Sequence, residues 1–268
     1  MKPYKELFNK AEDTLRSQSK LTMQEFDSRI GKFKTYGGRL LSDNDYFDRL
    51  VKVIFYSGFK AEIVTAKLGI IGNHFPSYNT VATYGNARIK QIIDDPFMIS
   101  NEKKIMACVN NAKVFQTIIN QYGSFKGYVD SFRATESFEN LILFKEEIEY
   151  KFEYLGKITA YHFMTDIGLP VLKPDRTITR IFERIGLIES REQLLKTVII
   201  GRKFSQQTGQ PIRYIDIVFA KYGQMGEDEN FGLDDGICLE EYPKCSICGI
   251  QGYCDYYTRQ HQIVSAKV

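Results

Sequence analysis

Several features that would place a protein in a membrane or outside the cell are missing from this chain. Its 268 residues contain no run of about 18 apolar side chains, so we expect no membrane-spanning helix. The first residues lack the apolar core of a signal peptide, which predicts a cytoplasmic protein. Cysteines stay reduced in that compartment and can serve there as metal ligands.

An excess of charge of one sign is also missing. The 36 Lys and Arg residues nearly balance the 33 Asp and Glu residues, and the formal net charge is +3. This balance is compatible with nucleic-acid binding but does not argue for it, because DNA-binding domains usually carry a stronger basic excess. The sequence shows no internal repeats, and its length allows one large or two small domains with their own cores.

Sustained alternation of apolar and polar residues, which is typical of β-strands, is hard to find. Apolar residues instead recur at helical spacing in runs such as 46–55, 105–115 and 178–185. We therefore predict an all-α fold.

Four of the five cysteines lie close together near the C-terminus. Cys238, Cys245, Cys248 and Cys254 have the spacing C-x6-C-x2-C-x5-C, which predicts either a tetrahedral zinc site or an iron–sulfur cluster. Structural zinc sites usually pair their ligands in two short C-x2-4-C units, so a single C-x2-C with a wide gap on each side favours the bulkier 4Fe-4S cluster. Zinc and disulfide bonds stay open as alternatives. The fifth cysteine, Cys108, is expected in the core.

This cysteine spacing resembles the cluster loop of endonuclease III and the adenine-mismatch glycosylases, which belong to the helix-hairpin-helix DNA glycosylase superfamily. The resemblance extends over about residues 40–257, whereas residues 1–40 match nothing that we can name. It implies a two-lobed α-helical fold with the active site in the cleft between the lobes, and double-stranded DNA as the partner. It also implies a hairpin motif and a catalytic aspartate upstream of the cysteines.

The segment Phe152–Ala160 (FEYLGKITA) resembles the hairpin of that superfamily, L-P-G-V-G-x-x-T-A, with Glu153 at the proline and Tyr154 at a glycine. In the superfamily, the hairpin amides and the start of the following helix grip a DNA phosphate, a role that suits unpaired N–H groups at a helix N-terminus. An ordinary turn between two helices would look similar. The residues to which the resemblance assigns DNA contacts are Leu155, Gly156, Lys157 and Thr159.

Asp175 is the residue to which the resemblance assigns catalysis. In the superfamily, an aspartate begins the helix that follows the loop after the hairpin. Gly168, Pro170 and Asp175 have the same spacing from glycine through proline to aspartate as the family. A carboxylate there would stabilise the positive charge that develops on deoxyribose as the N-glycosidic bond breaks, and would orient a water for attack. Without the resemblance, such an aspartate would be interpreted as a helix N-cap.

Superfamily members that also cleave the DNA strand carry a lysine two residues after the last hairpin glycine, where this chain has Ile158. Lys157 lies one residue earlier, although its separation from Asp175 matches the lysine-to-aspartate separation of the family. We predict a monofunctional glycosylase, with AP lyase activity through Lys157 as the alternative.

The stretch from Phe152 to Gly168 also resembles 3-methyladenine DNA glycosylase I, in the pattern F-x-Y-L-G-x-x-T-x-Y-x-F-M-x-x-I-G. This pattern makes Tyr161 a candidate for the base pocket, whereas Phe163 and Met164 fit core packing. The zinc ligands that the family carries near its termini have no counterpart here.

The segment Phe47–Lys60 resembles the helix and turn of endonuclease III that fill the hole left by a flipped base. The expected glutamine is replaced by Gly58, so a neighbouring side chain would have to stack on the base or wedge into the duplex. The candidates are Tyr56, Phe59 and Lys60.

We expect one lobe at residues 40–145 and a second lobe formed by 1–39 together with 146–268. The parts of the second lobe are the helix-hairpin-helix at 143–168, the aspartate loop at 169–177 and the cluster loop at 238–254.

The predicted function is that of a monomeric, nucleoid-associated base-excision-repair DNA N-glycosylase that flips a damaged or mispaired base and hydrolyses its glycosidic bond. The alternative class is a non-catalytic DNA-binding or redox-sensing iron–sulfur protein on the same scaffold. The acidic stretch 239–244, where relatives are rich in Lys and Arg, mildly favours this alternative.

The cysteine spacing leads to a direct chemical prediction. Protein purified without oxygen should be brown, with about four irons and four inorganic sulfides per chain, because four thiolates hold one cubane. Metal and sulfide analysis tests this expectation. Stoichiometric zinc without iron would contradict it.

Overall fold

The computed structural model describes residues 2–38 and 40–265, with the side chains of 36–38 and 261–265 excepted. Regular structure in this part of the chain is helical, and its one β feature is an isolated bridge between Asp228 and Leu233. The all-α prediction is therefore confirmed. Among the described helices, none is long and apolar enough to cross a membrane.

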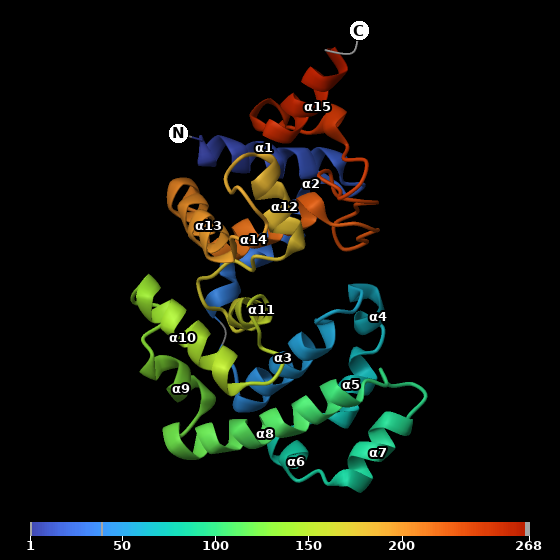
Figure 1. The fold of residues 1–268 in the computed structure, drawn as a ribbon, viewed down its shortest axis with the longest axis vertical. Coiled ribbons are helices and arrows are strands. Elements are labelled where there is room, and N and C mark those ends of the chain that lie inside the picture. Colours follow the sequence, from blue (N-terminus) through green and yellow to red (C-terminus); the bar gives the residue numbers. More distant parts are fainter. Residues whose placement is uncertain (1, 39, 266–268) are drawn as a thin grey trace. The chain divides into compact units, whose positions relative to one another are not determined.

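The chain forms two compact units (Figure 1). A central unit contains Arg39–Leu169, and a terminal unit combines the segment up to Gly38 with the chain from Pro170 onwards. The expected division placed residues 146–169 with the terminal segments. They group with the central unit instead, because α11 (Thr159–Asp166) packs on α3 (Asp43–Tyr56) and on α10 (Phe138–Lys151).

The central unit is arranged around α8 (Glu102–Tyr122), against which helices α3, α6, α7 and α9 pack. Helix α8 begins at an Asn101 side chain that accepts from the Lys104 N–H, and it ends at Gly123, whose φ of 78° suits a residue without Cβ. The remaining helices of this unit are α4 (Ala61–Thr65), α5 (Leu68–His74), α6 (Tyr78–Ala82), α7 (Asn86–Asp94) and α9 (Phe125–Ser131).

Aromatic rings fill the core of the central unit. Phe115 of α8 stacks on Phe125 with ring centroids 4.2 Å apart, and Phe125 in turn contacts Phe152 at 6.2 Å and Phe163 at 6.0 Å. Since Phe152 is the first residue after α10, this ring cluster anchors the start of the predicted hairpin. The core positions expected for Phe163, Met164 and Cys108 are confirmed, because all three side chains are fully buried.

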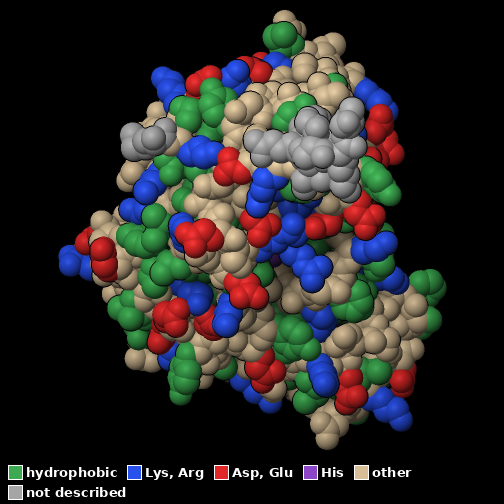
Figure 2. Space-filling view, turned by 45° about the horizontal axis from the view of Figure 1, so that its top comes forward, with side chains coloured by type: hydrophobic (Ala, Val, Ile, Leu, Met, Phe, Trp, Pro, Cys, Tyr) green, Lys and Arg blue, Asp and Glu red, His purple; other side chains and the backbone are tan. Residues whose placement is uncertain are grey.

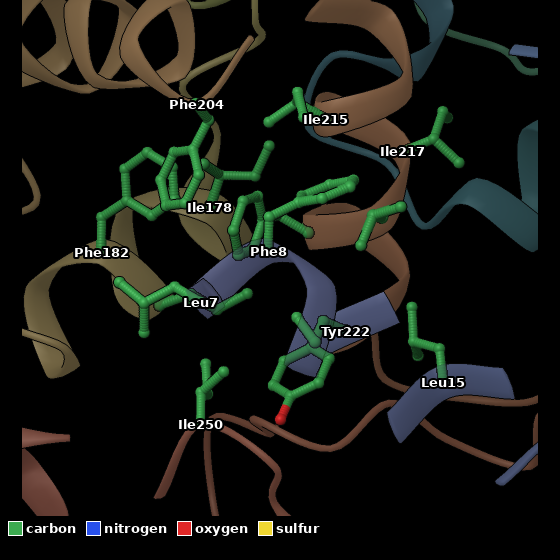
Figure 3. Packing of buried hydrophobic residues seen from close by; sticks show 14 of the residues in the cluster. Leu7, Phe8, Leu15, Ile178, Phe182, Phe204, Ile215, Ile217, Tyr222 and Ile250 are labelled. Carbon is green, nitrogen blue, oxygen red and sulfur yellow. The ribbon is translucent and has the colours of Figure 1, made fainter. Parts of the chain in front are cut away.

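The terminal unit forms around α1 (Tyr4–Gln18), whose apolar side chains lie on one face of the helix. Figure 3 shows Leu7, Phe8 and Leu15 of this helix among apolar side chains from the C-terminal half of the chain. The ring centroids of Phe204 and Phe219 lie 4.9 Å apart in this core. The other elements are α2 (Met23–Gly31), η1 (Lys32–Gly38), α12 (Arg176–Arg184), α13 (Leu194–Thr208), α14 (Ile212–Gly223), η2 (Cys245–Ile247), η3 (Gln251–Tyr253) and α15 (Asp255–Ser265).

Charged side chains of both signs are mixed on the surface that Figure 2 shows. Lysines and arginines stand beside aspartates and glutamates over most of this face. Any binding of a phosphate backbone on this face therefore depends on how a few charged and polar groups are arranged, and not on a broad basic surface.

Candidate functional site

The predicted hairpin lies between α10, which ends at Lys151, and α11, which begins at Thr159. The Thr159 hydroxyl closes the loop: it accepts from the Gly156 N–H at 2.7 Å and donates to the Tyr154 carbonyl at 2.6 Å. Tyr154 has a φ of 65°, in the left-handed region where a glycine is more stable. Leu155 is buried and holds the loop against the unit.

The start of α11 carries free backbone donors. In the described part of the chain, the N–H groups of Lys157, Ile158 and Thr159 have no acceptor, and no side chain caps the helix. The first N–H groups of a helix point along its axis and are at the positive end of the helix dipole. This end of the hairpin can therefore bind an anion.

Lys157 is exposed and forms no ion pair within the described residues, whereas Ile158 is half-buried. Of the four residues assigned to DNA contact, Gly156 and Lys157 are thus on the surface, and Leu155 and Thr159 shape the loop from inside. The structure keeps the hairpin geometry despite the two sequence departures at Glu153 and Tyr154.

Asp175 in the terminal unit is the N-cap of α12. Its Oδ1 accepts from the N–H groups of Thr177 at 3.0 Å and Ile178 at 3.1 Å. Its Oδ2 lies 3.1 Å from Nζ of Lys173, and the carboxylate is about a quarter exposed. One oxygen is therefore fixed by the helix, and the other stays accessible beside a cation.

A second carboxylate supports the loop before Asp175. Asp216 of α14 is buried, and its Oδ1 accepts from the Lys173 N–H at 2.9 Å while its Oδ2 pairs with Arg213 at 2.6 Å. Burial raises the pKa of Asp216, and the Arg213 guanidinium opposes that rise. The main chain two residues before Asp175 is thus tied to the core.

The turn after α3 carries the candidates for the wedge. Gly58 has a φ of 76°, which is unfavourable for a residue with a side chain, and no atom lies within 4 Å of the position that a Cβ would take. A glutamine there would fit sterically but would have a strained backbone. The buried Nζ of Lys104 lies 5.4 Å from the centroid of the Phe59 ring. The Tyr56 hydroxyl bonds to Thr65 at 2.9 Å, and Lys60 is the N-cap residue of α4.

Tyr161, the candidate for the base pocket, is buried in the central unit. It is 3% exposed, and Nζ of Lys145 lies 5.6 Å from its ring centroid. Burial raises the pKa of its phenol. Like Phe163 and Met164, Tyr161 is therefore a buried residue of α11 in this geometry.

The four C-terminal cysteines are free thiols, and three of them pack against the core of the terminal unit. Hydrogen-bond donors reach their sulfurs: Nη1 of Arg184 lies 3.3 Å from Cys238 Sγ, and the Tyr257 N–H lies 3.4 Å from Cys254 Sγ. The Tyr222 hydroxyl, which points out of the ring cluster in Figure 3, lies 3.1 Å from Cys248 Sγ. Among the described residues, no group of three or more His, Cys, Asp or Glu is arranged to hold a metal ion.

Burial raises the pKa of the Cys248 thiol to about 11, and burial also raises the pKa values of Cys245 and Cys254. Neighbouring cysteines add to these shifts, because thiolates close together repel one another. A cationic metal group is the usual partner that allows such thiolates to form.

Two arginines of α12 hold the loop between the first two cysteines. Arg180 donates to the Cys238 carbonyl at 3.1 Å and to Glu240 Oε2 at 2.8 Å, and Arg184 donates to the Glu240 carbonyl at 2.8 Å. Glu240 also pairs with Arg191 at 2.7 Å. The acidic character of this loop is therefore partly neutralised within the protein.

Sequence reasoning missed the buried polar residues that support these loops. Lys104 and Asn111 of α8 contact the wedge turn and the hairpin, and Asp216 supports the aspartate loop. The one available signal was the pair Asn110-Asn111 in the middle of an apolar helical run, where asparagine is unfavourable without a partner.

Comparison with known proteins gives both a family and a fold. A sequence model of the methyladenine glycosylase family matches residues 33–175, which is more than half of the chain. Among solved structures, 3-methyladenine DNA glycosylase I from Staphylococcus aureus is 21% identical, with 51% of this chain and 83% of that chain covered and a TM-score of 0.42.

Two further structures match along most of the chain. The 8-oxoguanine DNA glycosylase of Thermotoga maritima is 18% identical, with 81% of this chain and 95% of that chain covered and a TM-score of 0.51. Endonuclease III in a trapped covalent intermediate with DNA is 15% identical, with 90% and 99% covered and a TM-score of 0.52. At these identities the matches show a shared fold, and they confirm the predicted helix-hairpin-helix glycosylase fold.

Glu240 provides a test by pH. Hydrogen bonds from Arg191 and then Arg180 lower its pKa to about 2 from the ordinary 4.5. Because the pKa is lower in the folded state, the stabilisation is present above about pH 4.5 and is lost as the pH falls towards 2.

Replacing Glu240→Gln should lower the free energy of unfolding at pH 7 by about 1 kcal/mol, a modest amount because the carboxylate is more than a third exposed. The difference from wild type should shrink as the pH falls below about 4.5 in urea titrations. Glu241→Gln, which removes an exposed charge, is the matched control and should have little effect at either pH. A constant difference across the pH range would contradict this assignment.

Proposed function

The chain belongs to the methyladenine glycosylase family, and we propose that Asp175 and the amides at the start of α11 are the parts with which it acts on DNA. As a member of this family, it is a DNA N-glycosylase that works in base excision repair and hydrolyses an N-glycosyl bond. Which base it removes, and whether it also cleaves the strand, belong to the proposal.

The observation that carries the proposal is the uncapped start of α11. The successive N–H groups of residues 157–159 have no acceptor among the described residues, and Gly156 and Lys157 are exposed beside them. A DNA phosphate would supply the missing acceptors and would be favoured by the helix dipole, without any requirement for base identity. The hairpin would thus fix the register of the duplex while other residues select the base.

Asp175 would act on the sugar. When the bond between C1′ and the base nitrogen breaks, its electron pair leaves with the base and positive charge develops on the deoxyribose ring. The accessible Oδ2 would stabilise that charge and orient a water, whose oxygen adds to C1′ and whose proton is lost to the carboxylate. The two N–H groups on Oδ1 hold the carboxylate in place, so little reorganisation is needed.

The substrate would be duplex DNA from which the damaged base is flipped. The name of the family makes a methylated adenine the first base to test. Phe59, Tyr56 and Lys60 would act at the hole left by the base, whereas Tyr161 would need to move to reach it, because it is buried. A monomeric state and a cytoplasmic, nucleoid-associated location stay predictions.

Cys238, Cys245, Cys248 and Cys254 would hold a 4Fe-4S cluster. The chemistry of the donors suits such a group, since all four thiols are free and N–H or O–H groups lie beside three of the sulfurs, and binding would have to draw together sulfurs that the described residues do not arrange as a metal-ion site. When bound, the cluster would supply a rigid cross-link for the C-terminal loop. Arg180 and Arg184 would hold this loop on α12 through the carbonyls of residues 238–240.

Strand cleavage would require a lysine amine that attacks C1′ to form a Schiff base. Lys157 is exposed and without a described ion pair, and Ile158 offers no nucleophile. Since an amine that serves as a nucleophile is usually activated by a dry pocket or a nearby cation, we favour hydrolysis by water.

Replacing Asp175→Asn should abolish base excision and leave the affinity for undamaged duplex similar or slightly tighter. The change removes a negative charge near the DNA and keeps a side-chain oxygen that can cap α12. Single-turnover excision, scored as abasic sites on duplexes with methylated adenine, tests this outcome. A near-normal rate in the variant would show that another group performs the reaction.

Borohydride should trap no covalent complex between the wild-type protein and DNA that contains an abasic site. This follows from the solvent-exposed position of Lys157 and from the apolar side chain at position 158. Electrophoresis under denaturing conditions gives the readout. Trapping that is lost in Lys157→Ala but kept in Lys173→Ala would establish the bifunctional alternative.

A further inference from the structure

The hairpin departs from the family pattern at two adjacent residues, and α8 contacts both of them. Glu153 stands where the pattern has a proline, and Tyr154 stands where it has a glycine. Proline restricts the backbone and has no N–H, and glycine adopts a positive φ at no steric cost. This chain therefore lacks the restraint of the proline, and the positive φ of Tyr154 has a steric cost that a glycine would avoid.

Asn111 of α8 bonds to both backbone groups of Glu153. Its Oδ1 accepts from the Glu153 N–H at 2.9 Å, and its Nδ2 donates to the Glu153 carbonyl at 2.9 Å. The Asn111 side chain is fully buried, so these bonds are shielded from water and their loss would leave buried polar groups unpaired. Two parallel bonds fix the position and also the orientation of this peptide.

Lys104, two turns earlier on α8, contacts the next residue. Its Nζ lies 4.7 Å from the centroid of the Tyr154 ring and donates to the carbonyls of Ile54 and Ser57. A cation held by two carbonyls attracts the face of the ring. The ring contact therefore favours Tyr154 in the left-handed conformation that it adopts, with φ at 65°.

We propose that Asn111 and Lys104 are positioning residues that replace the missing proline and glycine and so determine where the phosphate-binding amides of the hairpin point. The proposal rests on the proposed function, because it takes the N–H groups of residues 157–159 as the phosphate site. Those groups begin three residues after Tyr154, and the Tyr154 carbonyl accepts from the Thr159 hydroxyl at the start of α11. A rotation of the Glu153 peptide would therefore be transmitted to the start of the helix.

The main test measures binding of an undamaged duplex of fixed sequence by fluorescence anisotropy. Asn111→Ala should weaken binding about tenfold, which corresponds to the loss of about one net hydrogen bond of a buried pair. Asn110→Ala is the matched control: its Nδ2 bonds only to the side chain of Glu153, at 2.9 Å, so binding should stay within about twofold of wild type. Binding within twofold in Asn111→Ala would overturn the proposal.

A double-mutant cycle separates positioning from a general loss of stability. The change Tyr154→Gly removes the steric cost of the positive φ and keeps the Glu153 N–H that bonds to Asn111, so adding Asn111→Ala in that background should cost less than about threefold in affinity. An equal loss in both backgrounds would show that Asn111 is merely structural and would overturn the proposal.

Hydrogen exchange on the wild-type protein gives a readout that needs no variant. The Glu153 amide should be protected, whereas the amides of Lys157 and Ile158 should exchange rapidly. Equal, rapid exchange at all three positions would overturn the proposal even if Asn111→Ala failed to fold.

The outcomes also separate this proposal from the function on which it rests. A wild-type protein that does not bind duplex DNA would refute the hairpin as a phosphate site. A wild-type protein that binds, with an Asn111→Ala variant that binds equally well, would refute only the role of α8.

Discussion

The first N–H groups of a helix need acceptors, and the two helices that carry the candidate site meet this need in opposite ways. Helix α12 is capped from within, because Oδ1 of Asp175 accepts two of its N–H groups. Helix α11 has no side-chain cap, and in the described structure the N–H groups of residues 157–159 at its start have no acceptor. One helix start thus orients a carboxylate, and the other leaves donors for an anion.

Both arrangements depend on buried polar side chains that come from elsewhere in the chain. Asp216 holds the peptide of Lys173 near the capping aspartate, and Asn111 holds the peptide of Glu153 in the hairpin. A buried polar group that lacks its partner is costly, so each pair has essentially one favourable geometry. The loops of the site are therefore ordered by a few directional bonds as well as by apolar packing.

The sequence predicted those parts of the site that depend on local order. The helix-hairpin-helix expected at 143–168 is found as α10 (Phe138–Lys151) and α11 (Thr159–Asp166), because a glycine turn and helical spacing are local signals. The N-cap position of Asp175 could likewise be predicted from the neighbouring residues alone. The tether from Asn111 to Glu153 spans 42 residues, and no local pattern specifies such a pair.

The division of the chain into two units and the role of the acidic loop also could not be predicted from local sequence patterns. Residues 146–169 join the central unit because of how α11 packs on α3, which depends on contacts across more than a hundred residues. The acidic stretch between Cys238 and Cys245 mildly favoured the non-catalytic alternative, but Glu240 is paired with Arg180 and Arg191. The sign of a side chain says little about the field outside the protein until its partners are known.

The terminal unit is assembled from both ends of the chain, and this affects the order of events during synthesis. Residues 39–169 are contiguous, so their core needs no residue of α12 or of the helices that follow it. Helix α1 is translated before the central unit, yet Leu7, Phe8 and Leu15 pack against side chains that are translated on the order of ten seconds later. Over that interval the apolar face of α1 has no partner and is open to a chaperone. The cysteine loop is translated after α1, α12, α13 and α14, so a metal group would bind to a core whose other helices have already been made.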